Sequence, residues 1–272
     1  MEIILEETPE AVASRCADLC VAELQHNPRL VMGLATGSSP LLLYRELINR
    51  REQREISFKD VQTFNLDEYV GLPVDHPQSY RRFMDENFFR HIDIVPSNTN
   101  VPGGMLADPA LCGSIYEKLI TNVGGIDLQI LGIGRNGHIG FNEPTSSFNS
   151  RTRVKTLSDE TVRDNSRFFG EGETQPHLSV TMGIKTILEA RRVILIATGE
   201  NKAEAVAAAV EGPMAAICPA SSLQLHENAA IIVDQAAASR LKLTKYYVNT
   251  TAEQDRLNRE RIRSGKSGPL SS

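Results

Sequence analysis

The chain has no long apolar run, no excess of basic residues and few cysteines, and each absence narrows its class. No apolar stretch among its 272 residues approaches the ~20 residues of a membrane-spanning helix. The net charge of −5 lacks the basic excess typical of nucleic-acid-binding proteins, so we expect neither nucleic acid nor membrane as a partner. The four cysteines, Cys16, Cys20, Cys112 and Cys218, form no C-x-x-C pair and are expected to be reduced. Acidic residues follow Met1 where a secretory signal carries bases, so we expect a soluble cytoplasmic protein.

Motifs of several enzyme classes are also missing. There is no G-x-S-x-G of a serine hydrolase, no H-E-x-x-H of a zinc protease and no G-K-S/T ending of a P-loop. Gly132, Gly134 and Gly137 do spell G-x-G-x-x-G, the pattern of dinucleotide-binding folds. That pattern requires a helix opening at the third glycine, and Gly140 and Pro144 break any helix there. The dinucleotide interpretation is therefore rejected.

Several segments repeat one plan, in which a short apolar run is followed by a polar or glycine-rich turn and then by a helical pattern. The apolar runs cover residues 30–35, 61–66, 126–131, 193–197 and 229–233. Continuous apolar strands separated by helices predict an α/β fold, an open, mostly parallel, doubly wound sheet with helices on both faces. We expect a single catalytic domain over residues 1–250. In such sheets ligands bind at the carboxyl ends of the strands, where the polar turns lie.

Two segments depart from this plan. Residues 146–182 follow the glycine-rich turn with a capped helix near Ser158 and further glycines, which is typical of a helical lid and equally of an exposed surface helix. Residues 251–272 are polar and end in serine and glycine, which predicts a frayed C-terminal tail.

The glycine-rich turn over residues 130–144 presents His138 and Glu143, a titratable pair suited to proton transfer at neutral pH. Asp67 follows a predicted strand and is a candidate general base, although a turn aspartate is as common there. These three side chains could also ligate a cation, but no metal-ligand spacing supports this, so no metal is predicted.

Two helix starts are candidate anion sites. Thr36, Gly37, Ser38 and Ser39 lie between a strand and a helix, with Ser39 as the expected N-cap and Pro40 as the first helical residue. The alternative is a well-capped helix without a ligand. Lys202 opens another helix, where Asn201 and Glu204 form a capping-box pattern. A lysine there opposes the helix dipole unless an anion compensates it. Arg167, in the lid segment, could bring a second cation.

These motifs, taken together, resemble the glucosamine-6-phosphate deaminase family, which is related to the 6-phosphogluconolactonases. The resemblance covers nearly the whole chain up to about residue 250 and rests on the segments LATGSSP (34–40), TFNLDEYVGL (63–72), GIGRNGHIGFNEP (132–144), SRTRVKT (150–156), NSRFF (165–169) and LQLH (223–226). It implies conversion of glucosamine 6-phosphate into fructose 6-phosphate and ammonia, without a cofactor.

The resemblance also implies residue roles. Asp67 matches the base that moves a proton between C2 and C1, and His138 matches the group that opens the sugar ring, supported by Glu143 and Asn136. Ser38, Ser39, Arg167 and Lys202 match phosphate contacts. Ser146, Ser147, Arg153 and Lys155 match positions of an allosteric activator site in relatives that form hexamers. Whether this chain has that site, or forms a homo-oligomer, stays open.

One residue departs from part of the family. Some members have Asp where this chain has Asn136, and an Asn orients an imidazole by hydrogen bonding and not by charge. We therefore expect His138 to depend more on Glu143 and to have a lower pKa than in the Asp-bearing members.

Two alternatives to a deaminase remain, a lactonase acting on a phosphorylated sugar acid and a non-catalytic sugar-phosphate sensor. A lactonase has no need of a base at C1–C2, so Asp67 separates the two enzymes.

Overall fold

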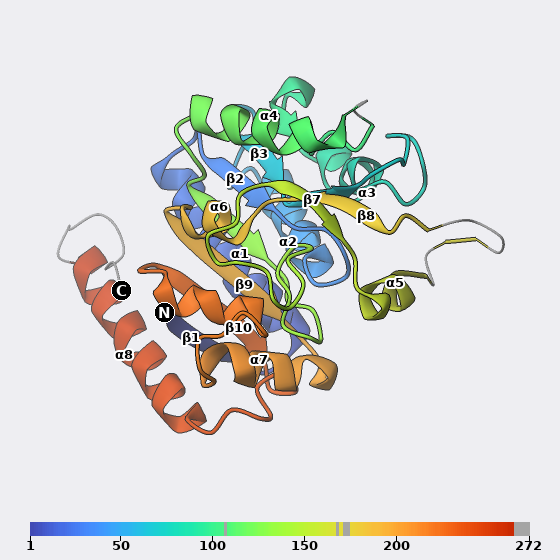
Figure 1. Cartoon of the computed structure of the whole chain (residues 1–272). Coiled ribbons are helices and arrows are strands. Elements are labelled where there is room, and N and C mark those ends of the chain that lie inside the picture. The colour runs from blue at the N-terminus through green and yellow to red at the C-terminus, as the bar shows by residue number, and fades with distance from the viewer. Residues whose placement is uncertain (106–107, 167–168, 171–174, 264–272) are drawn as a thin grey trace.

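The computed structural model describes residues 1–105, 108–166, 169–170 and 175–263 of the chain. Its centre is a seven-stranded sheet (Figure 1), in which every adjacent pair of strands is parallel. In spatial order the strands are β1 (Glu2–Glu6), β10 (Ala229–Asp234), β9 (Arg192–Ala197), β6 (Leu128–Leu131), β2 (Val31–Leu34), β3 (Gln62–Asn65) and β5 (Thr99–Asn100).

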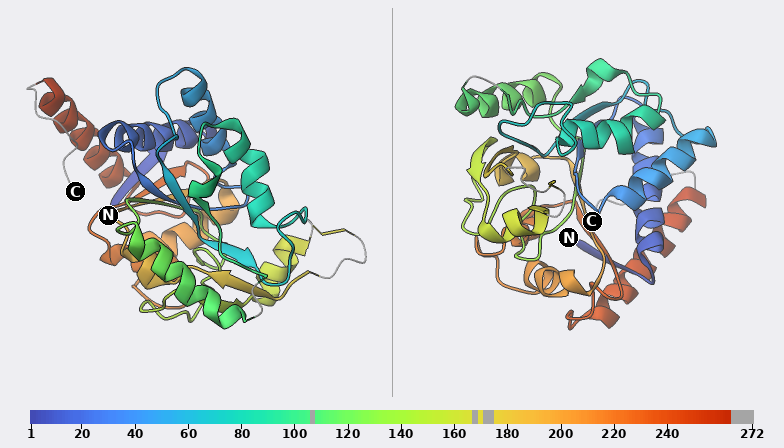
Figure 2. Two further views of the ribbon diagram at one scale, coloured as in Figure 1. Left: turned by 90° about the horizontal axis from the view of Figure 1, so that it is seen from above. Right: turned by 90° about the vertical axis from the view of Figure 1, so that its right-hand side faces the viewer.

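Helices cover both faces of this sheet (Figure 2). The α-helices are α1 (Pro9–His26), α2 (Leu41–Glu52), α3 (Tyr80–Asn87), α4 (Pro109–Asn122), α5 (Asp159–Ser166), α6 (Ile184–Leu188), α7 (Ala203–Val210) and α8 (Thr244–Arg263). Short 3-10 helices are η1 (Phe89–His91), η2 (Pro96–Asn98), η3 (Glu200–Lys202) and η4 (Pro219–Leu225). Buried residues of α1, α2 and α3 belong to one core cluster, and those of α4, α6 and α7 to another. The predicted doubly wound sheet is confirmed.

Local chemistry explains where these elements begin. At α1, the Thr8 side chain accepts a hydrogen bond from the Ala11 N–H at 3.2 Å and Pro9 takes the first helical position. Cys16 and Cys20 lie one turn apart on the buried face of this helix, and both are free thiols. The prediction that Cys16 and Cys20 face the core is confirmed.

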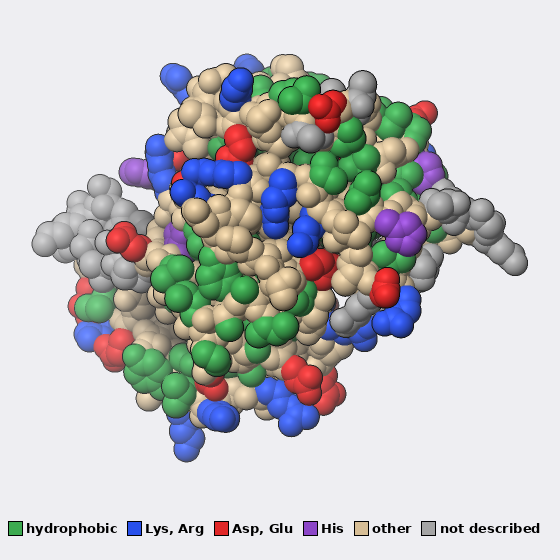
Figure 3. Space-filling model, viewed as in Figure 1, with side chains coloured by type: hydrophobic (Ala, Val, Ile, Leu, Met, Phe, Trp, Pro, Cys, Tyr) green, Lys and Arg blue, Asp and Glu red, His purple; other side chains and the backbone are tan. Residues whose placement is uncertain are grey.

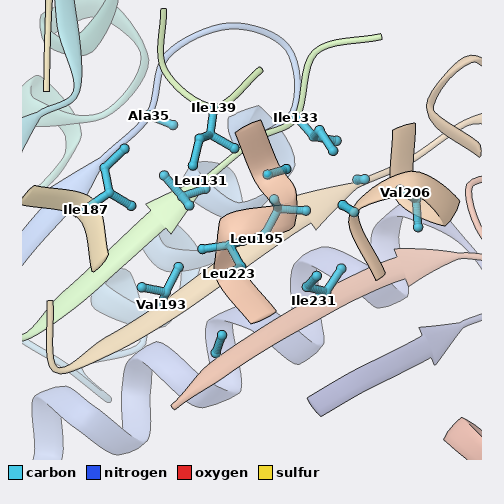
Figure 4. Packing of buried hydrophobic residues seen from close by; sticks show 14 of the residues in the cluster. Ala35, Leu131, Ile133, Ile139, Ile187, Val193, Leu195, Val206, Leu223 and Ile231 are labelled. Atoms are coloured by element: carbon cyan, nitrogen blue, oxygen red, sulfur yellow. The ribbon is translucent and has the colours of Figure 1, made fainter. Parts of the chain in front are cut away.

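The apolar core reaches the functional end of the sheet. Figure 4 shows Ile133 and Ile139, from the glycine-rich turn, packed near Leu131 and Leu195 of the central strands. Ile133 is 4% exposed and Ile139 is fully buried. Burial of these two side chains anchors the turn, so that the polar residues between them are held at fixed places.

A second, three-stranded antiparallel sheet, in the order β4 (Asp67–Tyr69), β8 (Leu178–Thr181) and β7 (Arg153–Thr156), lies beside the first. Two of its strands come from the segment 146–182, which the sequence predicted to be a helical lid. The helix α5 is present, and the Ser158 hydroxyl accepts a hydrogen bond from the Thr161 N–H at 3.2 Å, as the capping pattern predicted. The strands on either side of α5 were not predicted, because each is only four residues long. Lid motion stays a prediction.

The predicted frayed tail from residue 251 onward is wrong over residues 251–263, which continue α8. The helix lies along β1 (Figure 1), where the Thr251 hydroxyl donates to the Ile3 carbonyl at 3.1 Å and Arg15 pairs with Asp255 at 2.6 Å. Arg256 pairs with Glu253 and Glu260 one turn away on either side. Such ion pairs stabilise a polar helix. The helix was not predicted because its sequence has little apolar periodicity.

No helix within the described residues is long and apolar enough to span a membrane. On the face that Figure 3 shows, basic and acidic side chains are interspersed over the described residues, in keeping with the net charge of −5.

Candidate active site

A cavity of about 420 Å³ opens at the carboxyl ends of the central strands, where the sequence placed the ligand site. Its lining comes from the turns after β2 and β6, from β4, and from α3, α5 and η3. The residues that line it are Ala35, Thr36, Gly37, Ser38, Ser39, Leu66, Asp67, Tyr80, Gly132, Ile133, Gly134, Arg135, His138, Gly140, Phe141, Thr161, Arg163, Asn201 and Lys202. The volume is ample for a sugar phosphate.

The predicted anion loop is part of this lining, and Thr36, Gly37, Ser38 and Ser39 all contribute to it. Gly37 has a φ of +90°, which lets the chain turn sharply after β2. The prediction that Ser39 is the N-cap residue of this helix is wrong. Helix α2 begins at Leu41 with Pro40 as its N-cap residue, and no side chain caps it, because proline has no hydrogen-bonding side chain. The first-turn N–H groups of α2 therefore lack the side-chain partner that Ser39 was expected to supply, which suits an anion.

Lys202, at the end of η3 after β9, also lines the cavity. The expected capping box of Asn201 and Glu204 is not formed. The chain makes the 3-10 turn η3 before α7, so Lys202 itself is the N-cap residue of α7 and no side-chain cap bond is made. Asp234, at the end of β10, accepts the Gly199 N–H at 3.1 Å and fixes the turn that carries Lys202. Arg167, the other predicted phosphate cation, lies outside the described residues.

Close packing explains two glycines of the turn after β6. A Cβ at Gly134 would lie 2.2–2.5 Å from atoms of the His138 ring, so only glycine lets the imidazole lie against the backbone. Gly137 has a φ of +82°, and a Cβ there would meet the Cys218 sulfur at 2.6 Å. The Gly134 N–H donates to the His138 carbonyl at 2.9 Å and closes the loop. These glycines serve packing around His138 and not a dinucleotide.

His138, Asn136 and Glu143 form one hydrogen-bonded network. The Asn136 Nδ2 donates to Glu143 Oε2 at 2.9 Å, since a carboxylate only accepts, and its Oδ1 lies 2.7 Å from His138 Nδ1. Nδ1 must then carry the proton, which leaves Nε2 as the acceptor nitrogen of the neutral ring. The direct Nδ1–Oε2 distance is 3.8 Å, so Glu143 acts on the imidazole through the Asn136 amide. The Thr161 hydroxyl of α5 donates to the other oxygen, Oε1.

Asp67 also lines the cavity, at the start of β4, where it is paired with Thr181 of β8. Its side chain is 5% exposed, and burial, with the nearby charge of Glu68, raises the pKa of Asp67 to about 8. The Phe141 N–H is a hydrogen-bond donor that opposes this rise. Gly140 leaves room for the carboxylate, because a Cβ there would stand 3.3 Å from Asp67 Oδ2.

Four residues of the site were missed from sequence. Arg135 and Arg163 line the cavity as further cations, Tyr80 forms part of its wall, and Thr161 donates to Glu143. Arg135 stands within the glycine-rich turn, so its place there was a signal that could have been used. For the other three there was no comparable signal, because α3 and α5 reach the cavity only through the tertiary fold.

The predicted activator residues lie outside the cavity lining. The Arg153 Nη1 donates to Asn142 Oδ1 at 2.9 Å, which ties β7 to the turn that carries Glu143. The Ser147 hydroxyl accepts the Asn149 N–H at 3.2 Å. Ser146 is 2% exposed, and its hydroxyl has no hydrogen-bond partner among the described residues. Lys155 is partly buried on β7. An activator site at these residues stays a prediction.

Among the described residues, no group of three or more His, Cys, Asp or Glu side chains is arranged to hold a metal ion. Proton-transfer groups and cations around one cavity are the chemistry that these residues offer. The fold and the cavity thus define an α/β protein in which titratable side chains and cations line one cavity at the carboxyl ends of the strands.

Residues 5–232 match the family of glucosamine-6-phosphate isomerases and 6-phosphogluconolactonases, and the chain belongs to this family. A glucosamine-6-phosphate deaminase of Hahella chejuensis is 59% identical over 247 residues, which cover 91% of this chain and 94% of that protein. A protein of the same name from Cellvibrio japonicus is 55% identical over 257 residues, 94% of this chain and 98% of that one.

Solved structures agree with this assignment. A monomeric glucosamine-6-phosphate deaminase matches with a TM-score of 0.86 at 42% identity, over 88% of this chain and 100% of that chain. A 6-phosphogluconolactonase from Trypanosoma brucei matches with a TM-score of 0.69 at 21% identity, over 89% and 98% of the two chains. This second likeness shows a shared fold.

Proposed function

We propose that the protein converts glucosamine 6-phosphate and water into fructose 6-phosphate and ammonia. The observation that carries this proposal is one cavity lined by Asp67, by His138 and by cations, with His138 held by Asn136 and Glu143. The names of the curated relatives, at 50–59% identity, support the same reaction. The reaction breaks a C–N bond with water, so it is an isomerisation coupled to hydrolysis.

In the proposed mechanism, His138 catalyses the opening of the sugar ring. Its Nε2 accepts the proton of the C1 hydroxyl and returns a proton to the ring oxygen as the C1–O5 bond breaks, which leaves an aldehyde at C1. Asn136 holds the tautomer in which Nε2 is the acceptor, and Glu143 holds Asn136 at 2.9 Å. Orientation of this kind acts before any charge develops on the ring.

Asp67 transfers the proton in the isomerisation step. The C2–H bond breaks as the proton passes to the Asp67 carboxylate, one proton of the C2 ammonium group moves to O1, and a C1–C2 double bond forms. Asp67 then returns its proton to C1 while the nitrogen lone pair forms a C2–N double bond. Water adds to C2, and ammonia leaves as the ketone forms. Each step is a proton transfer, the addition of water or a bond cleavage assisted by proton transfer, so the proposed sequence of steps uses no cofactor or metal.

The phosphate group is assigned to the start of α2 and to the cavity cations. Thr36, Ser38 and Ser39 offer hydroxyl and N–H donors, and Lys202 offers an ammonium group. Because the chain carries a net charge of −5, attraction of an anionic substrate depends on such local groups. Arg135 and Arg163 are further candidates for this role.

The test is to measure ammonia and fructose 6-phosphate formed from glucosamine 6-phosphate by the purified protein, with EDTA in the buffer. Equal amounts of both products are expected, at a rate that EDTA leaves unchanged. Hydrolysis of 6-phosphogluconolactone is assayed in parallel. Lactone hydrolysis without ammonia release would replace the deaminase by a lactonase, and binding of the sugar phosphate without turnover would replace it by a sensor.

A further inference from the structure

Glu68 is a buried carboxylate beside the proposed base, and neither proton-transfer step uses it. Successive residues of a strand point to opposite faces, so Asp67 lines the cavity while Glu68, its neighbour on β4, does not. Glu68 is 4% exposed. A carboxylate at such a place is costly to bury unless other groups hold it.

The first turn of α3 supplies most of those groups. The N–H groups of Tyr69 and Tyr80 donate to Glu68 Oε1 at 2.8 and 3.0 Å. The Ser79 hydroxyl and the Arg81 N–H donate to Oε2 at 2.8 and 3.0 Å. Glu68 thus receives four hydrogen bonds, three of them from residues at the start of α3, where the helix dipole also favours a negative charge. Burial raises the pKa of Glu68, and these donors oppose the rise.

Tyr80, which Glu68 holds by its backbone, forms the cavity wall next to Asp67. Its ring stacks on Phe141 at 5.8 Å with an interplanar angle of 19° and lies 5.1 Å from the Tyr69 ring. Tyr80 and Thr36 of the anion loop line the same cavity. The start of α3 therefore packs against β4 and forms the cavity wall that also includes the loop proposed to bind phosphate.

Glu68 also acts on Asp67 through its charge. Burial is the largest cause of the raised pKa of Asp67, and the charge of Glu68 is the second. The other charged or titratable groups around Asp67 are Tyr80 from α3, Tyr116 from α4 and, in the lining of the same cavity, Arg135, His138, Arg163 and Lys202.

We propose that Glu68 is a positioning residue of the isomerisation, whose carboxylate fixes the start of α3 and Tyr80 in the cavity wall and whose charge makes Asp67 the stronger acceptor for the C2 proton. The proposal rests on the proposed function. A carboxylate that holds its proton more tightly lowers the barrier for removing a weakly acidic C–H proton.

The first variant is Glu68→Gln, which keeps the volume and removes the charge, and which leaves one accepting oxygen because an amide NH2 group only donates. Loss of a nearby negative charge lowers the pKa of Asp67, so we expect the acid limb of the kcat/KM profile to move to lower pH by roughly one unit. We expect kcat on the alkaline plateau to fall about tenfold, because Asp67 is then a weaker base. The matched control is Glu86→Gln, which changes an exposed carboxylate of α3 that pairs with Arg82. It should leave the acid limb and kcat unchanged.

A merely structural role for Glu68 predicts a different result. Loosening of α3 would lower kcat at every pH and leave the acid limb where it is in the unmodified protein. That outcome, or a limb that moves to higher pH, would overturn the proposal.

A measurement without turnover separates this proposal from the proposed function. The Asp67 carboxyl carbon is followed by ¹³C NMR as the pH changes, with its signal assigned by its loss in Asp67→Asn. We expect its titration midpoint to be lower in Glu68→Gln, whatever the substrate is. If the unmodified protein releases no ammonia, the proposed function fails; if the midpoint is the same in both proteins, the present proposal fails.

Glu68→Asp tests the contacts apart from the charge, and it carries the test should Glu68→Gln not fold. Aspartate keeps the charge but is one methylene too short to reach all four donors. We expect an acid limb that stays in place, a kcat about tenfold lower and a raised KM, because the start of α3 and Tyr80 shift. An unchanged kcat, or a limb that moves as far as in Glu68→Gln, would overturn the proposal.

Discussion

Two carboxylates of the site, Asp67 on β4 and Glu143 at the end of the glycine-rich turn, are buried to the same extent but have different surroundings. Each is 5% exposed. Glu143 accepts hydrogen bonds from the Asn136 amide and the Thr161 hydroxyl, whereas Asp67 has the Phe141 N–H as donor and the charge of Glu68 nearby. The difference teaches that the partners of a carboxylate, and not its burial alone, decide whether it orients a neighbour or takes a proton.

The largest expected effect is on the reaction itself. Asp67→Asn removes the proton acceptor and keeps the shape, so deamination should fall about 10³-fold or more in kcat. Binding of fructose 6-phosphate, measured by calorimetry, should be retained, because the phosphate contacts are elsewhere in the cavity. Activity within tenfold of the unmodified protein would show that another group removes the C2 proton.

The same substitution should raise stability at alkaline pH. The folded-state pKa of Asp67, about 8, lies above the unfolded value of about 3.9, so the folded state binds the proton more tightly and stability falls as pH rises from about 4 to about 8. Asparagine has no charge to bury, so Asp67→Asn should gain roughly 3–5 kcal/mol over the unmodified protein at pH 8.5 and little at pH 4. Urea unfolding at both pH values measures this.

The exposed Asp60 provides the control for that measurement. Asp60→Asn should show no comparable gain at either pH. Equal stability of Asp67→Asn and the unmodified protein at pH 8.5 would mean that Asp67 ionises in the folded state without cost. That result would contradict the claim that the surroundings of Asp67 disfavour its charged form.

A smaller effect is expected from the turn that holds His138. In Gly134→Ala the new Cβ would stand 2.2–2.5 Å from the imidazole, so the ring must move. A displacement of this order should lower kcat about 10²-fold while KM changes less. Gly124→Ala, strained by its φ of +88° but outside the cavity, should lower stability without changing kcat. If Gly134→Ala has normal kcat, the position of the ring is not limiting.

The smallest effect is expected from Asn136→Asp, which converts the amide between His138 and Glu143 into a second carboxylate. Added negative charge favours the protonated imidazole, so the His138 ring should titrate roughly one unit higher, measured by ¹⁵N NMR, with less than a tenfold change in kcat. The new carboxylate would stand where the amide now lies, 2.9 Å from Glu143. An unmoved titration would show that orientation, and not charge, governs His138 here.

The sequence predicted the parallel sheet well, because its strands are continuous apolar runs with a polar turn at each end. The edge strands β1 and β5 were missed. β1 carries a glutamate at each end, and β5 has only two residues. The strands β4, β7 and β8 were missed for a related reason, since they are short and their pairing depends on contacts between distant parts of the chain.

For the site, the sequence determined which side chains are available. Asp67, His138 and the anion loop stand directly after strands of a parallel sheet, whose carboxyl ends all meet at one edge. Helix caps were predicted less well: Ser39 and Asn201 were expected as N-cap residues, but the N-cap of each helix is the next residue, Pro40 or Lys202. Cap positions depend on backbone dihedral angles that single residues do not fix.

The sequence by itself determined the fold class, the edge of the sheet that carries the cavity, and several of the residues that line it, because periodicity and turn chemistry are local properties. The tertiary structure decided the rest. It put Asn136 between His138 and Glu143, brought Tyr80, Thr161 and Arg163 to the cavity from separate helices, and buried Asp67 beside Glu68. Those facts set the basicity and the orientation of the reacting groups, and they arise from burial and distance between elements, which no stretch of the chain encodes alone.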